Sequence, residues 1–167
     1  MNVTLPIHVS IISDHGSELQ PAQEEKLNNT LFDIWFNYGR QVVLHHGCIS
    51  EADNIAHRGA RGVGWRIEGH PACAPGSVAP RQAASSWSEL AVLHPARARG
   101  DRDLDLIWAS TVIVAVESER ASISSLVTQA TDAGWTAVHI EVPTLRAFQP
   151  SAVTSLLPVH DLTDVWR

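Results

Sequence analysis

The sequence is poor in cysteine and in long apolar runs. Two of its 167 residues are cysteines, Cys48 and Cys73, and they lie in different segments. Two separated thiols form neither a disulfide framework nor a zinc motif such as C-x-x-C. This cysteine usage is typical of a reducing compartment, so we expect a cytoplasmic protein.

The chain also lacks a run of 18 apolar residues, so we expect no membrane span and no membrane partner. Its first residues, MNVTLPIHVSIIS, have no basic start and no long apolar core, so we expect no signal peptide. The 12 Lys and Arg residues are outnumbered by 18 Asp and Glu, which gives a formal net charge of -6. A nucleic-acid partner is not expected without a basic surface. The local cluster of Arg97, Arg99 and Arg102 leaves a small anionic ligand open.

Short apolar runs alternate with amphipathic segments along a length that suits one domain. The expected strands are 7–13, 41–45, 65–69, 111–116 and 137–142. The expected helices are 21–38, 101–109, 123–133 and one that starts at 51, runs through 60 and stops near 62–64. Residues 89–93 fit a short strand or a loop, and 151–157 a short helix. This alternation predicts an α/β protein, a single Rossmann-like domain with a mostly parallel sheet flanked by helices. Its core spans about 7–143, with a C-terminal tail at 144–167.

The most informative segment is 42–72, which fits a strand, a turn, a short helix, a second strand and a loop. It places His46, Gly47 and Asp53 at the carboxyl end of a buried strand, where open α/β sheets bind ligands. His45 and His46 face opposite sides of that strand. We favour His46 for the ligand side because Gly47 opens space beside it. Asp53 is either a ligand-facing acid or part of the helix cap that Ser50 begins.

Three other residue types carry weaker signals. The nine histidines show no HxH, HxxxH or HExxH spacing, so we expect no bound metal and no cofactor. Cys48 precedes a helix, where the pKa of a thiol can fall, but a small residue in a tight turn is the better interpretation. Trp87 in a polar loop either stacks on a base or contacts a partner subunit.

Two elements of the sequence resemble the SLOG superfamily of Rossmann-like proteins, which includes the DprA/Smf fold and the LOG-type phosphoribohydrolases. His46-Gly47, Ala52-Asp53 and Ile55-Ala56 resemble its HG…GAD.iA element, and Gly64 with His70-Pro71-Ala72 resembles the G..v..fPA continuation. Arg102-Asp103 and residues 108–115 are similar to its RN…v..aD.liA element. Together these elements span about residues 7–143.

The resemblance implies a SLOG-type fold, a nucleotide or nucleotide-derived ligand and a homo-oligomer. It implies that the phosphate meets Arg102 and the loop after the first strand, although Arg102 also suits an ion pair with a neighbouring aspartate. The residues expected to bind the ligand are Ser13, Asp14, His15, His46, Gly47, Asp53, His70, Arg102, Glu117, Ser118 and Ser122.

One departure from the family bears on activity. The phosphoribohydrolases carry a PGGxGTxxE loop, whereas residues 116–124 of this chain read VESERASIS and contain no glycine. Without glycine the backbone cannot approach a phosphate as closely. We therefore expect a sensor or sequestering protein. The alternatives are a nucleoside monophosphate N-glycosidase or phosphoribohydrolase, with Glu117 or Asp53 as catalytic acid, and an interaction module without a ligand.

Overall fold

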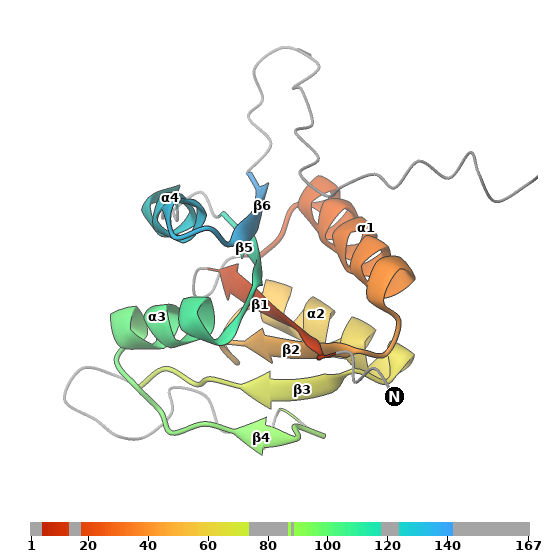
Figure 1. The fold of residues 1–167 in the computed structure, drawn as a ribbon, viewed down its shortest axis with the longest axis horizontal. Coiled ribbons are helices and arrows are strands. Elements are labelled where there is room, and N and C mark those ends of the chain that lie inside the picture. The colour runs from red at the N-terminus through yellow and green to blue at the C-terminus, as the bar shows by residue number, and fades with distance from the viewer. Residues whose placement is uncertain (1–4, 14–17, 74–86, 88, 118–123, 142–167) are drawn as a thin grey trace, which may run out of the picture.

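The computed structural model describes residues 5–13, 18–73, 87, 89–117 and 124–141 (Figure 1). In this part of the chain six strands form one parallel sheet in the order β4-β3-β2-β1-β5-β6. The strands are β1 (Ile7–Ser13), β2 (Val42–His46), β3 (Arg66–Gly69), β4 (Val92–Leu93), β5 (Val112–Val116) and β6 (Thr136–Ile140). The helices are α1 (Pro21–Tyr38), α2 (Glu51–Val63), α3 (Arg99–Ala109) and α4 (Ser124–Asp132). The predicted α/β class and the Rossmann-like parallel sheet are confirmed.

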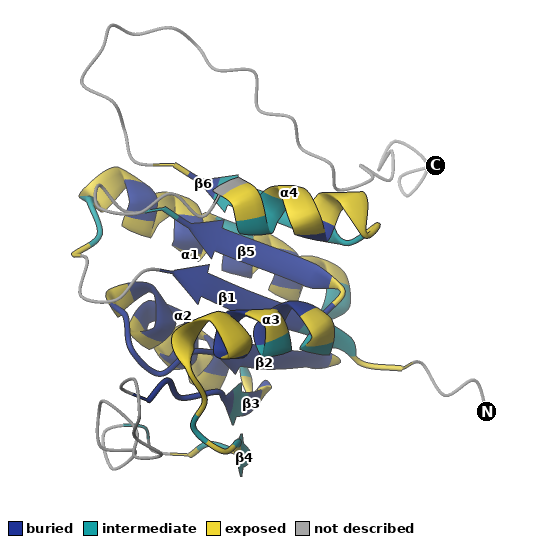
Figure 2. Ribbon diagram, turned by 90° about the vertical axis from the view of Figure 1, so that its left-hand side faces the viewer, coloured by how far each residue is buried: buried dark blue, intermediate teal, exposed yellow. Residues whose placement is uncertain are grey.

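Helices cover both faces of the sheet (Figure 2). On one face, Leu27 and Ile34 of α1 and Ile55 of α2 pack in one apolar cluster with Val9 and Leu44 of the central strands. On the other, a smaller cluster joins Leu106 and Ile107 of α3 and Ala130 of α4 to strands β1 and β5. Strands β2 and β5 are buried at every position, as expected for a parallel sheet covered on both sides.

The ends of α1 and α2 follow local chemistry. Helix α1 starts at Pro21, whose missing N–H costs nothing at a first helical position. Helix α2 starts with a reciprocal cap between Ser50 and Asp53. It ends at Gly64, whose φ of 76° is a left-handed conformation that glycine adopts easily. The predicted start of α2 at residue 51 and its predicted stop near residues 62–64 are therefore both confirmed.

The buried face of α3 differs from the one expected from its apolar residues. The spacing of Leu104, Ile107 and Trp108 predicts that they share the buried side of this helix, but Leu104 is exposed and Trp108 is 71% exposed. The helix instead buries Ile107 with Leu106 and with the charged residues Arg102 and Asp103. Helical periodicity is read from the apolar residues alone, so it cannot predict that a charged pair is buried.

The strand order reverses beside β1, whose neighbours are β2 on one side and β5 on the other. In open α/β sheets, ligands bind at the carboxyl ends of the strands at such a switch point. Register pairs Ser13, the last residue of β1, with Val116, the last residue of β5. Glu117 follows directly, so Ser13 and Glu117 both lie at this edge. None of the described helices has both the length and the hydropathy that crossing a bilayer requires.

Some predicted features lie outside the described residues. These are the loop at 74–86, the residues after β5 at 118–123, and the tail at 144–167 with its expected short helix. Of the expected ligand-binding residues, Asp14, His15, Ser118 and Ser122 fall in such segments.

Candidate functional site

Arg102 is the most deeply buried cation of the described chain, with an exposed fraction of 2%. It lies in the first turns of α3, where its Nε donates to Oδ1 of Asp103 at 2.8 Å and its Nη2 donates to the same oxygen. Its third nitrogen, Nη1, is buried and has no hydrogen-bond partner among the described residues. A buried charged donor without a partner is costly, so this nitrogen is a group whose missing acceptor calls for an explanation.

Gly47 lies directly against this guanidinium, at the carboxyl end of β2. A Cβ atom at position 47 would overlap Nη1 of Arg102 and would lie 3.4 Å from Oδ2 of Asp53. Glycine is therefore required here for a close approach. The space beside Gly47 is filled by Arg102, from which helix α2 and strands β3 and β4 separate it in the sequence.

Asp53 is buried next to Arg102 and caps α2. Its Oδ2 accepts backbone N–H groups from Ile49 at 2.9 Å and Ser50 at 3.1 Å, and its Oδ1 accepts from Gly47 at 3.3 Å. Burial raises the pKa of this carboxyl, and the Ile49 N–H and the Arg102 charge oppose that rise. The cap interpretation of Asp53 is thus confirmed by geometry. A role toward a ligand stays a prediction, because both oxygens are already engaged.

Asp103, which sequence reasoning did not single out as a site residue, completes a buried set of two carboxylates and one guanidinium. Burial raises the pKa of Asp103, and the charge and hydrogen bonds of Arg102 oppose this. Its signal in the sequence is its place directly after Arg102, where it is one of the neighbouring aspartates that suit an ion pair.

His46 faces α2, away from the Gly47 and Arg102 contact. Its Nδ1 accepts the Cys48 backbone N–H at 3.2 Å, which leaves the proton on Nε2, and Nε2 lies 3.0 Å from Nδ1 of His57. Trp87 packs on both rings, with centroids 4.8 Å from His46 and 5.3 Å from His57. Burial, followed by the charge of His57, lowers the pKa of His46 to about 3. His46 is therefore a neutral imidazole at neutral pH.

Cys48 adopts a left-handed conformation, with φ of 58°, in the turn between β2 and α2. Burial raises the pKa of its thiol to about 12, and nearby Asp53 adds to that rise. A thiol with this pKa is not a thiolate nucleophile at neutral pH. The interpretation of Cys48 as a small residue in a tight turn is consistent with this geometry.

His70 follows β3 and lies on the sheet face opposite to His46. Its backbone N–H donates to the His46 carbonyl at 2.8 Å, while its ring Nε2 lies 3.0 Å from Nδ1 of His45. Its ring also stacks on His94, with centroids 4.0 Å apart. Burial, followed by the charges of the neighbouring histidines, lowers the pKa of His70 to about 3. Burial likewise lowers the pKa of His45 to about 4.

Ser13 and Glu117 flank the switch point, and each contacts side chains of other elements. The Ser13 hydroxyl bonds that of Ser50 at 2.5 Å. The Glu117 carboxylate lies 3.6 Å from Nε2 of His139, and its main-chain carbonyl accepts the buried Gln23 amide at 2.8 Å. Among the predicted residues, the structure thus brings Arg102, Gly47 and Asp53 together, and it places His46 and His70 on opposite faces of the sheet.

A parallel sheet of this order, covered by helices on both faces and carrying buried charges at its carboxyl edge, defines a Rossmann-like α/β domain. Solved structures of the molybdenum cofactor carrier protein from Chlamydomonas reinhardtii have a similar fold. One aligns with a TM-score of 0.57 at 16% identity, over 83% of this chain and 79% of the carrier. Another aligns with a TM-score of 0.55 at 17% identity, over 83% and 78%. Neither a family model nor a curated protein matches the sequence.

Proposed function

We propose that this protein binds a phosphate-bearing small molecule, a nucleotide or nucleotide derivative, at the carboxyl ends of its strands. The observation that carries the proposal is Nη1 of Arg102, a buried guanidinium nitrogen without an acceptor among the described residues. Guanidinium groups match phosphate oxygens in charge and in geometry. Asp103 holds the other two nitrogens, so the side chain is oriented before a ligand arrives.

The remaining predicted ligand contacts, Ser13, Glu117, His46 and His70, belong to this proposal. So do the four residues Asp14, His15, Ser118 and Ser122, which lie outside the described segments. SLOG membership and a homo-oligomeric state are part of it too. Sedimentation velocity tests the oligomeric state, where a monomer at micromolar concentration would contradict it.

A holding role is favoured over turnover. The segment after β5 contains no glycine, and the Glu117 carboxylate pairs with His139. The two aligned solved structures are of a molybdenum cofactor carrier protein, and this supports a role in which the site holds its ligand without converting it.

The test is a titration of the full chain with mono-, di- and triphosphate nucleotides, followed by calorimetry and thermal unfolding. A ligand that binds the folded state raises the apparent stability. Arg102→Lys keeps the charge but loses the planar fork, and we expect at least about tenfold weaker binding, since a hydrogen bond to a charged group contributes about 1.5–3 kcal/mol.

Arg61→Gln is the matched control, because Arg61 pairs with Glu89 at the far end of α2 and is exposed. We expect it to bind as the parent does. If no nucleotide raises the unfolding temperature at millimolar concentration, or if Arg102→Lys binds equally well, the phosphate assignment is wrong. Chromatography of the same mixtures should show no free base, and its release would establish the N-glycosidase alternative.

A further inference from the structure

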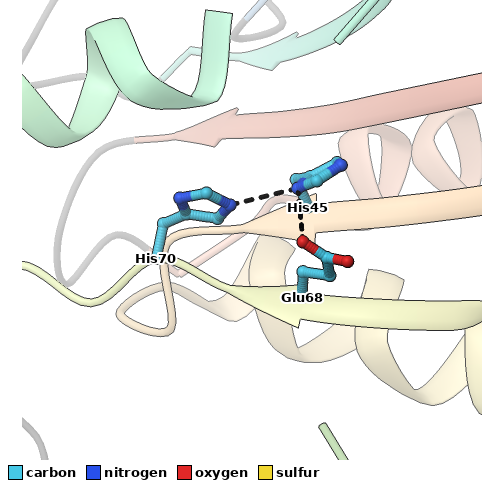
Figure 3. A group of neighbouring side chains, drawn as sticks. All are labelled: His45, Glu68 and His70. Atoms are coloured by element: carbon cyan, nitrogen blue, oxygen red, sulfur yellow. Dashed lines mark hydrogen bonds and ion pairs between the residues drawn. The ribbon is translucent and has the colours of Figure 1, made fainter. Parts of the chain in front are cut away.

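Three side chains with metal-ligating atoms converge on one face of the sheet, apart from the Arg102 group. His45 lies on β2, Glu68 on β3 and His70 just after β3. The His70 ring points toward the His45 ring, which in turn lies next to the Glu68 carboxylate (Figure 3). One ligating atom from each of the three lies within 4.8 Å of the other two. Within the described residues, no other group of three His, Cys, Asp or Glu meets this condition.

The sheet itself sets this arrangement. Parallel register pairs His45 with Glu68, which places their side chains next to each other on the same face. His70 is two residues beyond Glu68, so the alternation of a strand returns its side chain to that face. The ligating residues therefore come from two neighbouring backbone segments that hydrogen bonds hold in register, and little ordering would be left for a metal to impose.

The distances suit a small divalent ion. Nδ1 of His45 lies 3.0 Å from Nε2 of His70 and 3.8 Å from Oε2 of Glu68. Ligand atoms about 2.0–2.1 Å from a tetrahedral zinc ion lie about 3.3 Å from one another. The two separations from His45 lie on either side of this value, and all three ligand atoms lie within 4.8 Å of one another, so the side chains would draw closer to bind one ion together.

Neighbouring side chains contact all three ligands and restrict how they can turn. Nε2 of His45 lies 2.9 Å from Nδ1 of His8 on β1, and Oε1 of Glu68 accepts Nε of Arg66 at 2.9 Å. Nε2 of His94 lies 3.0 Å from Oε2 of Glu68, and the His94 ring stacks on His70. Such outer contacts are what fixes the ring orientation of histidines in metal sites. The buried imidazoles are neutral, and this is the form that binds metals.

We propose that His45, Glu68 and His70 form a binding site for a divalent transition-metal ion of the zinc class, held by two imidazole nitrogens and one carboxylate oxygen. A set of three protein ligands leaves a further position for water or for a ligand atom. The proposal departs from the absence of metal expected from spacing within single segments, because these ligands are distributed over two strands. It does not depend on the proposed phosphate site.

The experiment is a calorimetric titration of the chelator-treated full chain with Zn²⁺, with no nucleotide present. We expect one ion per chain. Glu68→Gln and His70→Gln should each weaken binding at least about tenfold, since loss of even an outer partner of a metal ligand costs 10- to 100-fold. Glu25→Gln, which removes a carboxylate from the exposed side of α1, should bind as the parent does.

A second measurement needs no variant. Nitrogen NMR of the histidine rings in the unmodified chain should show Nδ1 of His45 and Nε2 of His70 shifting as Zn²⁺ is added. The proposal is overturned if these two nitrogens do not shift at a Zn²⁺ excess. It is equally overturned if folded Glu68→Gln and His70→Gln proteins bind Zn²⁺ as tightly as the parent.

Discussion

At the scale of single residues, the site is built on a contact between a side chain and a glycine. Arg102 reaches from α3 over Gly47, and only the missing Cβ allows this approach. The sequence indicated both residues through the resemblance. It could not indicate that they touch, because no local pattern encodes a contact between two distant elements.

The first prediction concerns Gly47→Ala. The new methyl group would overlap Nη1 of Arg102, so the guanidinium must move. It would then no longer be oriented toward the proposed phosphate. We expect nucleotide affinity to fall at least about tenfold, which corresponds to about 1.4 kcal/mol. Calorimetric titration with the nucleotide that binds the parent best measures this effect.

Gly62→Ala is the control for that substitution. Gly62 lies in α2, and no described atom comes within 4 Å of a Cβ placed there. Alanine is preferred over glycine inside a helix by about 0.5–1 kcal/mol, so this variant should be slightly more stable and bind as the parent does. If the two variants bind alike, the Gly47 contact does not position Arg102 for a ligand.

At the scale of elements, α2 depends on its first turn. Ser50 Oγ accepts the Asp53 backbone N–H at 2.9 Å while the Asp53 carboxylate accepts the Ser50 N–H. Because the same Asp53 faces Arg102, the cap of this helix is also a wall of the candidate site. The cap pattern S-E-A-D was visible in the sequence, and it fixed the start of α2 correctly.

The second prediction is that Ser50→Ala lowers the free energy of unfolding by about 1 kcal/mol, the usual cost of removing a helix cap. Thr30→Ala is the matched control, since Thr30 loses only an exposed hydroxyl that bonds the Lys26 carbonyl within α1. Surface substitutions of this kind change stability by about 0.5 kcal/mol or less. Urea unfolding of both variants measures the difference. Equal stabilities would mean that Ser50 contributes no cap.

The elements show how far the sequence could predict the structure. The sequence predicts an element well where one local pattern dominates. Helix α1 is an example, because its amphipathic pattern predicts the bounds 21–38 that the structure has. The buried face of α3 was wrong because Arg102 and Asp103 are buried as a pair. The histidines were judged by their spacing within a segment, so the convergence of His45 with His70 from adjacent strands was missed.

At the scale of the whole molecule, buried neutral histidines couple stability to pH. His46 has a pKa of about 3 in the folded chain and near 6.5 when unfolded, with His57 and His45 as its nearest titratable neighbours. The unfolded chain therefore binds more protons between these two values. This stabilising contribution is complete above about pH 6.5 and is lost as the pH falls toward 3.

The third prediction follows from this linkage. Between pH 6 and 4 the free energy of unfolding should fall by about 1.4 kcal/mol per pH unit for each buried neutral histidine. Urea unfolding at several pH values, with chelator present, gives the slope. His46→Gln should make it shallower by about 1.4 kcal/mol per pH unit. A slope that His46→Gln leaves unchanged would show that this imidazole is not held neutral by the fold.

The place of β1 in the sheet has a consequence for how the chain is made. Of the six described strands β1 is synthesised first, yet it lies inside the sheet, where Val9 pairs with Leu44 of β2 on one side and with Val112 of β5 on the other. Its edge toward β5 has no strand to pair with until residues 112–116 have been synthesised. Such distant pairing slows folding and leaves an unpaired strand edge exposed meanwhile. We therefore expect nascent chains that end before residue 112 to bind chaperones more than the complete chain does.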